Sequence, residues 1–164
     1  MNDEFNSSGL DADIHSEAET LAALLTERGL FVTAAESLTG GMISSSLVDI
    51  PGSSNWFSDG FVTYSNESKI KRLGVDAQTL VRETAVSAPV ARMMAAGALE
   101  KSGADFAVAV TGLAGPGADE YGRPAGLVYI GIAFRGGTAS KEYAFSGTRA
   151  DIRKKTNREA LILL

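Results

Sequence analysis

The residues from Phe106 to Val110 form an unbroken apolar run, and this run constrains the fold more than any other segment. A strand that is apolar on both faces is typical of a sheet covered by helices on both sides. A predicted short buried strand, Leu30 to Ala34, precedes a helical pattern over Met42 to Val48. Strands that alternate with helices predict a layered α/β domain. The late strands, which read as a hairpin, make the predicted sheet a mixed one.

Glycine, proline and capping residues divide the rest of the chain into further elements. An aromatic and β-branched stretch at Trp56 to Tyr64 predicts a strand. Glycines that follow a helical pattern mark helix ends. The remaining predicted elements are a helix over Glu67–Leu73 capped by Asn66, a helix over Ser87–Lys101, a hairpin of Gly126–Phe134 with Ser140–Phe145, and a final helix from about Ala150.

The first 13 residues are polar and lack periodicity, which predicts a disordered tail before a domain spanning residues 14–164. The sequence predicts Ser16 as the N-cap of the first helix, with Glu17 and Glu19 in its first turn. We expect this helix to end at Gly29. A length of 164 residues suits one domain with a hydrophobic core, and no internal repeat is present.

Charge and composition exclude several classes of function. The net charge is −5, but the first 15 residues hold four acids and no lysine or arginine, so the body is close to neutral. We therefore expect no nucleic-acid partner, and we interpret the basic residues between Arg149 and Arg158 as a solvated helix face. The apolar runs are too short to cross a bilayer and no export signal is evident, so we expect a cytoplasmic protein without a membrane partner.

The chain has no cysteine and a single histidine, His15, which lies in the polar N-terminal stretch. A serine activated by a lysine is therefore the remaining device for hydrolytic chemistry, because a desolvated lysine has a lowered pKa and acts as a general base. Residues 36–69 concentrate hydroxyl groups and include Lys69, although Lys71 and Arg72 are equally good by composition. Spacing does not choose the nucleophile, and its candidates are Ser37, Ser53, Ser54 and Ser65.

Three loops follow predicted strands, at 35–41, 64–66 and 111–125, and we expect them to form one pocket at the carboxyl edge of the sheet. The loop of Ser37, Thr39, Gly40 and Gly41 precedes a helix, where it forms either an anion cradle or a tight turn without ligand. It lacks the lysine of a P-loop. Three glycines between Thr111 and Gly117 leave backbone N–H groups free for an oxyanion or phosphate. No residues have metal-ligand spacing, so we expect no metal and no cofactor.

With these residues assembled, the chain resembles the CinA C-terminal domain family, whose members include bacterial nicotinamide-nucleotide amidases. The resembling blocks occur in family order over residues 16–162, and they are 35–41, 51–57, 60–69, 73–75, 85–87, 111–116 and 145–149. The resemblance implies a single three-layer α/β/α domain. It also implies hydrolysis of nicotinamide mononucleotide to nicotinate mononucleotide and ammonia by a serine–lysine mechanism without a metal.

The resemblance further implies roles for individual residues. Ser54 would be the nucleophile, Lys69 its base, and Tyr64 an aid to proton transfer or positioning. The residues implied to bind substrate are Ser37, Thr39, Gly40 and Gly41 in the pocket wall, Thr111 and Gly112 near the oxyanion, and Arg149 at the phosphate or ribose. We expect a small-molecule nucleotide substrate and a homo-oligomer. The alternative is an inactive pyridine-nucleotide-binding module.

One departure from the family pattern lies in the glycine-rich loop. Arg123 stands where many members have lysine, and its planar guanidinium is not interchangeable with an ammonium group.

Overall fold

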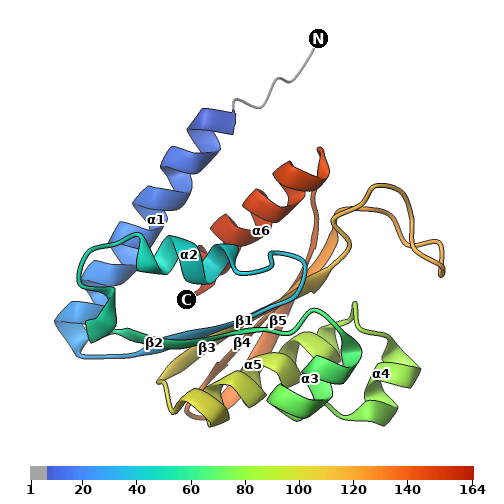
Figure 1. The fold of residues 1–164 in the computed structure, drawn as a ribbon, viewed down its shortest axis with the longest axis horizontal. Helices are drawn as coiled ribbons and strands as arrows, with labels where there is room; N and C mark the ends of the chain where they lie inside the picture. The colour runs from blue at the N-terminus through green and yellow to red at the C-terminus, as the bar shows by residue number, and fades with distance from the viewer. Residues whose placement is uncertain (1–6) are drawn as a thin grey trace.

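The computed structural model describes residues 7–164 and shows one open five-stranded sheet between two layers of helices (Figure 1). Helices α1, α2 and α6 cover one face, and α3, α4 and α5 cover the other. The strands are β1 (Val32–Glu36), β2 (Phe57–Val62), β3 (Phe106–Gly112), β4 (Leu127–Phe134) and β5 (Gly137–Ala144). The helices are α1 (Ser7–Arg28), α2 (Met42–Val48), the 3₁₀ turn η1 (Ser53–Asn55), α3 (Asn66–Leu73), α4 (Ala77–Glu83), α5 (Ala88–Ser102) and α6 (Arg149–Leu163). The predicted α/β domain with a mixed sheet is confirmed.

The strand order β2-β1-β3-β4-β5 places β1 between two parallel neighbours, and β4 and β5 continue the sheet in antiparallel fashion. Glu36, the last residue of β1, lies in register with Val62 of β2 and Val110 of β3. The chain leaves β1 through α2 to β2 and returns through α5 to β3 on the other side of β1. This reversal is a topological switch point, where ligands bind in open α/β sheets. The expectation that three loops meet at one sheet edge is confirmed.

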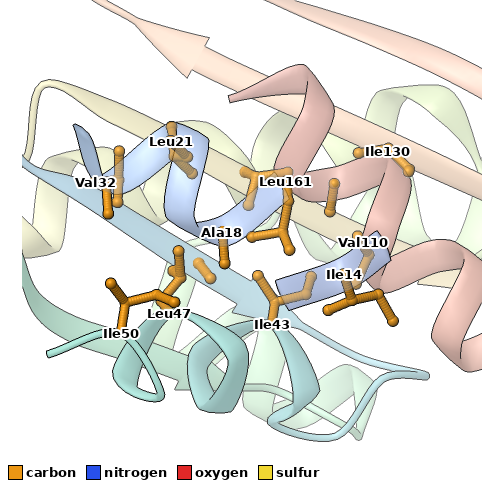
Figure 2. Close-up of a cluster of buried hydrophobic side chains, with 14 of the residues drawn as sticks. Ile14, Ala18, Leu21, Val32, Ile43, Leu47, Ile50, Val110, Ile130 and Leu161 are labelled. Atoms are coloured by element: carbon orange, nitrogen blue, oxygen red, sulfur yellow. The ribbon is translucent and has the colours of Figure 1, made fainter. Parts of the chain in front are cut away.

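Each face of the sheet packs against its own hydrophobic cluster. Figure 2 shows the cluster of α1, α2 and α6, in which Ala18, Ile43 and Leu161 pack over Val32 and Val110. The opposite cluster includes Ala35 of β1 and joins it to α3 and α5. Because side chains alternate along a strand, Glu36 extends toward the α2 face and Ser37 toward the α3 face. The pleat therefore separates two adjacent polar residues.

Two predictions about helices were incomplete. Residues 1–6 lie outside the described part of the chain, but α1 begins at Ser7, so the predicted tail through residue 13 is wrong from that point on. Leu10 and Ile14 extend the buried stripe of Ala18 and Leu21 in helical steps, and this stripe stabilises the helix despite its polar composition. Helix α4 was not predicted, although Asp76 caps it by accepting from the Thr79 N–H and hydroxyl.

No helix within residues 7–164 is long and apolar enough to cross a membrane.

Candidate active site

A cavity of about 320 Å³ lies at the carboxyl ends of β1, β2 and β3. This volume is at the lower end of the range of small-molecule sites. The cavity is lined by residues from all three predicted loops and from the amino end of α6. These are Ser37, Leu38, Tyr64, Asn66, Lys69, Ala85, Val86, the segment 111–119 and Arg149. The structure therefore brings together six of the predicted site residues, which are Ser37, Tyr64, Lys69, Thr111, Gly112 and Arg149.

Lys69 extends from α3 into the floor of this cavity and is 1 % exposed. Its Nζ lies 2.8 Å from the Thr63 carbonyl oxygen, 3.0 Å from Ser37 Oγ and 3.4 Å from the Tyr64 carbonyl oxygen. Burial lowers the pKa of Lys69 from 10.5 to about 8, because the charged form loses hydration. A shift of this size raises the neutral fraction of the amine at pH 7 by about 300-fold.

Lys69 Nζ donates to the carbonyls of Thr63 and Tyr64 and to Ser37 Oγ, three acceptors that match the three donors of an ammonium group. When Lys69 is neutral, one N–H is replaced by a lone pair, which can then accept the Ser37 hydroxyl proton. The Ser37 N–H is donated to the Val110 carbonyl of β3, so the serine is fixed between two strands. Ser37 Oγ and Lys69 Nζ thus lie within hydrogen-bond distance, a geometry in which a serine can act as nucleophile and a lysine as base.

Ser54 does not lie near Lys69, so the structure does not bring together the two residues that the family resemblance implied as a pair. Ser54 is exposed in η1, before the amino end of β2, whereas Lys69 follows the carboxyl end of that strand. Six strand residues separate the two ends by roughly 17–20 Å. Neither Ser53 nor Ser54 lines the cavity. Ser65 is also excluded, because its hydroxyl caps α3 by accepting from the Ser68 N–H. Ser37, a nucleophile candidate by composition that the resemblance implied in the pocket wall, is the serine beside the lysine.

The loop before α2 is not an open anion cradle. The buried carboxylate of Glu36 accepts from the N–H groups of Gly41, Ile43 and Ser44 and from the Ser44 hydroxyl, at 2.8–3.1 Å. A carboxylate of the chain itself therefore occupies the amino end of α2. Thr39, Gly40 and Gly41 do not line the cavity, so the structure does not support their predicted place in the substrate pocket.

Tyr64 and Arg149 lie together at the mouth of the cavity. Arg149 Nη1 donates to the Gly115 carbonyl at 2.7 Å, and Nη2 lies 3.4 Å from the Tyr64 hydroxyl oxygen. Tyr64 was expected to assist proton transfer, but only its main-chain carbonyl contacts Lys69, and its ring is 65 % exposed. The mouth presents a guanidinium group, which suits an anionic substrate.

The glycine-rich loop is fixed by buried polar contacts rather than left flexible. The Thr111 hydroxyl donates to the Ala85 carbonyl. Arg123 pairs with Asp119 and also donates to the Thr84 hydroxyl and the Val86 carbonyl. These contacts hold segment 84–86 against the loop, and Ala85, Val86 and residues 111–119 line the cavity. Arg123 thus serves the pocket wall through a forked set of donors that a lysine could not reproduce.

Sequence reasoning did not identify Ala85 or Val86 as pocket residues, and it included Asn66 and Asp119 only as members of the loops at 64–66 and 111–125. Asn66 was recognisable from its place between Tyr64 and Lys69, but its side chain had been interpreted only as a helix cap. Ala85 and Val86 have small apolar side chains that do not indicate a binding role in the sequence. Only their position beside β3 in the structure shows that they line the cavity. No cluster of His, Asp and Glu that could hold a metal occurs within residues 7–164.

A buried serine–lysine pair at the switch point of an open α/β sheet places the protein among α/β domains with a small-molecule pocket. The family profile of the CinA C-terminal domain matches residues 14–164, and the chain belongs to this family.

Among its relatives, a putative competence-damage inducible protein of Caldicellulosiruptor bescii is 49 % identical over 146 residues, which cover 89 % of this chain and 36 % of that protein. A CinA-like protein of Endomicrobium trichonymphae is 48 % identical over 159 residues, 97 % of this chain and 37 % of the relative. This chain therefore spans little more than a third of the length of these relatives.

Solved structures agree with the fold. The competence/damage inducible protein CihA of Agrobacterium tumefaciens has a TM-score of 0.89 and 44 % identity, with 92 % of this chain and 93 % of that one covered. The competence damage-inducible protein A (ComA) of Klebsiella pneumoniae has the same TM-score at 38 % identity and the same coverage. The sheet with its two helical layers is therefore a fold of this family.

Proposed function

We propose that the protein hydrolyses the carboxamide of nicotinamide mononucleotide to nicotinate mononucleotide and ammonia, with Ser37 as nucleophile and Lys69 as base. The observation that carries this proposal is the 3.0 Å contact between Ser37 Oγ and the buried Lys69 Nζ. The substrate class follows from the family resemblance and from Arg149 at the cavity mouth, where the nucleotide phosphate would bind.

In the first half of the reaction, neutral Lys69 takes the Ser37 proton as Oγ attacks the carboxamide carbon. The Leu38 N–H donates no hydrogen bond within the described residues, and Leu38 lines the cavity, so this group is available to the oxyanion. One such donor is typically worth about 3 kcal/mol in the transition state. The protonated Lys69 then delivers its proton to the departing nitrogen, and ammonia leaves an ester of Ser37.

In the second half, a water molecule attacks that ester while Lys69 again accepts the proton. The carbon–Oγ bond breaks, the proton returns to Ser37, and nicotinate mononucleotide is released. Overall, one water is consumed and one amide bond is cleaved. Tyr64 and Arg149 hold the nucleotide end of the substrate and take no part in the proton transfers.

The test is ammonia release from nicotinamide mononucleotide by the wild type, Ser37→Ala, Lys69→Met and Ser54→Ala. We expect loss of activity in the first two variants, and Ser54→Ala serves as the matched control that keeps the wild-type rate. A rate near that of the wild type in Ser37→Ala, or loss of activity in Ser54→Ala, would refute the assignment. Calorimetric binding of the nucleotide without ammonia release by the wild type would instead favour the inactive binding module.

A further inference from the structure

A second arginine of α6 contacts the loop that carries Ser37. Arg153 Nε donates to the Leu38 carbonyl at 2.9 Å, and Nη2 donates to the Thr39 carbonyl at 2.7 Å. Arg153 does not line the cavity, so it contacts the loop from outside the cavity. The sequence had suggested only a solvated basic helix face at this position.

The loop turns tightly beside this guanidinium group. Gly40 has φ +61°, a backbone conformation that favours glycine. The Gly40 N–H is donated to the Ser37 carbonyl, which closes a tight turn. In a trans peptide the N–H and C=O groups point in opposite directions. A fixed Ser37 carbonyl therefore also fixes the direction of the Leu38 N–H.

Two charged groups of opposite sign hold the loop from its two ends. Glu36 takes the N–H groups of Gly41, Ile43 and Ser44, and Arg153 takes the carbonyls of Leu38 and Thr39. Between them the nucleophile loop has little freedom to turn a peptide plane, because charge-assisted and forked hydrogen bonds are strongly directional.

Arg149 and Arg153 are four residues apart and so lie on one face of α6. The first contacts the glycine-rich loop and Tyr64 at the cavity mouth, and the second contacts the nucleophile loop. A single helix therefore sets the distance between the anion-binding end of the cavity and the nucleophile.

We propose that Arg153 is a positioning residue that fixes the Leu38 N–H and Ser37 Oγ relative to Lys69 and to the anchored substrate. This role rests on the proposed function, because it concerns attack by Ser37. Loss of the guanidinium leaves the cavity and Lys69 in place but allows the loop to rotate. A displacement of about 1 Å is enough to lower a rate by about 100-fold.

The experiment compares Arg153→Met and Arg153→Lys with Arg158→Met. Arg158 lies on the same helix but pairs with acids of α1 and with Glu159, so Arg158→Met matches the charge change without touching the loop. We expect Arg153→Met to lower kcat for ammonia release by about 10- to 100-fold with KM within about threefold. The kcat of Arg153→Lys should lie between those of the wild type and Arg153→Met, since an ammonium group reaches one carbonyl at a time.

A second readout does not depend on the natural substrate. A fluorophosphonate probe labels an activated serine when Oγ bonds to phosphorus, fluoride leaves and the proton passes to Lys69. We expect slower labelling of Ser37 in Arg153→Met than in Arg158→Met, at equal melting temperatures. Equal labelling rates, or a melting temperature that falls while kcat is unchanged, would overturn the positioning role. Absence of ammonia release by a wild type that is still labelled at Ser37 would overturn the proposed function alone.

Discussion

Replacement of Lys69 by methionine tests the link between burial and catalysis. Below pH 8, Lys69 is mainly protonated in both the folded and the unfolded wild type. Between the folded pKa of about 8 and the ordinary value of 10.5, the unfolded chain binds more protons. The free energy of unfolding of the wild type therefore gains a contribution from Lys69 as pH rises through this window, and loses it as pH falls through 8.

The size of the effect follows from the two pKa values. From pH 7 to pH 10, linkage gives the wild type a gain of about 2.5 kcal/mol that Lys69→Met lacks. At pH 7 the variant no longer buries an ammonium group, but the carbonyls of Thr63 and Tyr64 lose their donor. The informative quantity is the difference in free energy of unfolding between wild type and Lys69→Met, compared at pH 7 and at pH 10. The loss of the donor is the same at both pH values, so it cancels in this comparison.

The assay is urea unfolding of both proteins at pH 7 and pH 10, with Lys71→Met as the control. Lys71 lies on the same helix but is exposed, so its replacement should give a stability difference that hardly depends on pH. The reasoning fails if the difference between wild type and Lys69→Met stays constant within about 0.5 kcal/mol across this range. Such a result would mean that Lys69 titrates as a hydrated amine and is no base at neutral pH.

Three further outcomes are expected. The kcat/KM of the wild type should rise about tenfold per pH unit below pH 8 and level off above it, because the base is the neutral form of Lys69; a flat profile from pH 6 to pH 9 would contradict this. Glu36→Gln should lower the free energy of unfolding by roughly 2–4 kcal/mol, since its amide nitrogen faces donors at the start of α2. Urea unfolding measures this, and the exposed Glu67→Gln, which should change little, is the control. Arg123→Lys should raise KM several-fold with a smaller change in kcat, because it loosens the cavity wall at Thr84 and Val86; steady-state kinetics with an unchanged KM would count against it.

Local sequence signals predicted most of the elements. Helix α2 has the predicted bounds, and α5, β3 and the β4–β5 hairpin differ from prediction by a few residues at their ends. The errors lie where a local signal was weak. The early turns of α1 are stabilised by packing against other helices, and α4 is a short helix recognised mainly by its Asp76 cap.

The site was predicted as a set of loops but not as a set of contacts. Composition alone indicated a serine–lysine device, and the candidates left open included Ser37. The resemblance then favoured Ser54, which is closer to Lys69 along the chain. Strand β2 lies between these two residues, however, and carries them to opposite ends of the sheet.

The sequence by itself determined the strands, the helices, the glycine-rich loop and the presence of a lysine able to act as base. Only the tertiary structure decided which serine meets that lysine. The order β2-β1-β3 places the end of β1 beside the start of α3, and the pleat turns Ser37 toward Lys69 and Glu36 toward α2. Strand order and facing depend on contacts between distant segments. Such contacts form only when the two hydrophobic layers pack on the sheet, and no local pattern encodes them.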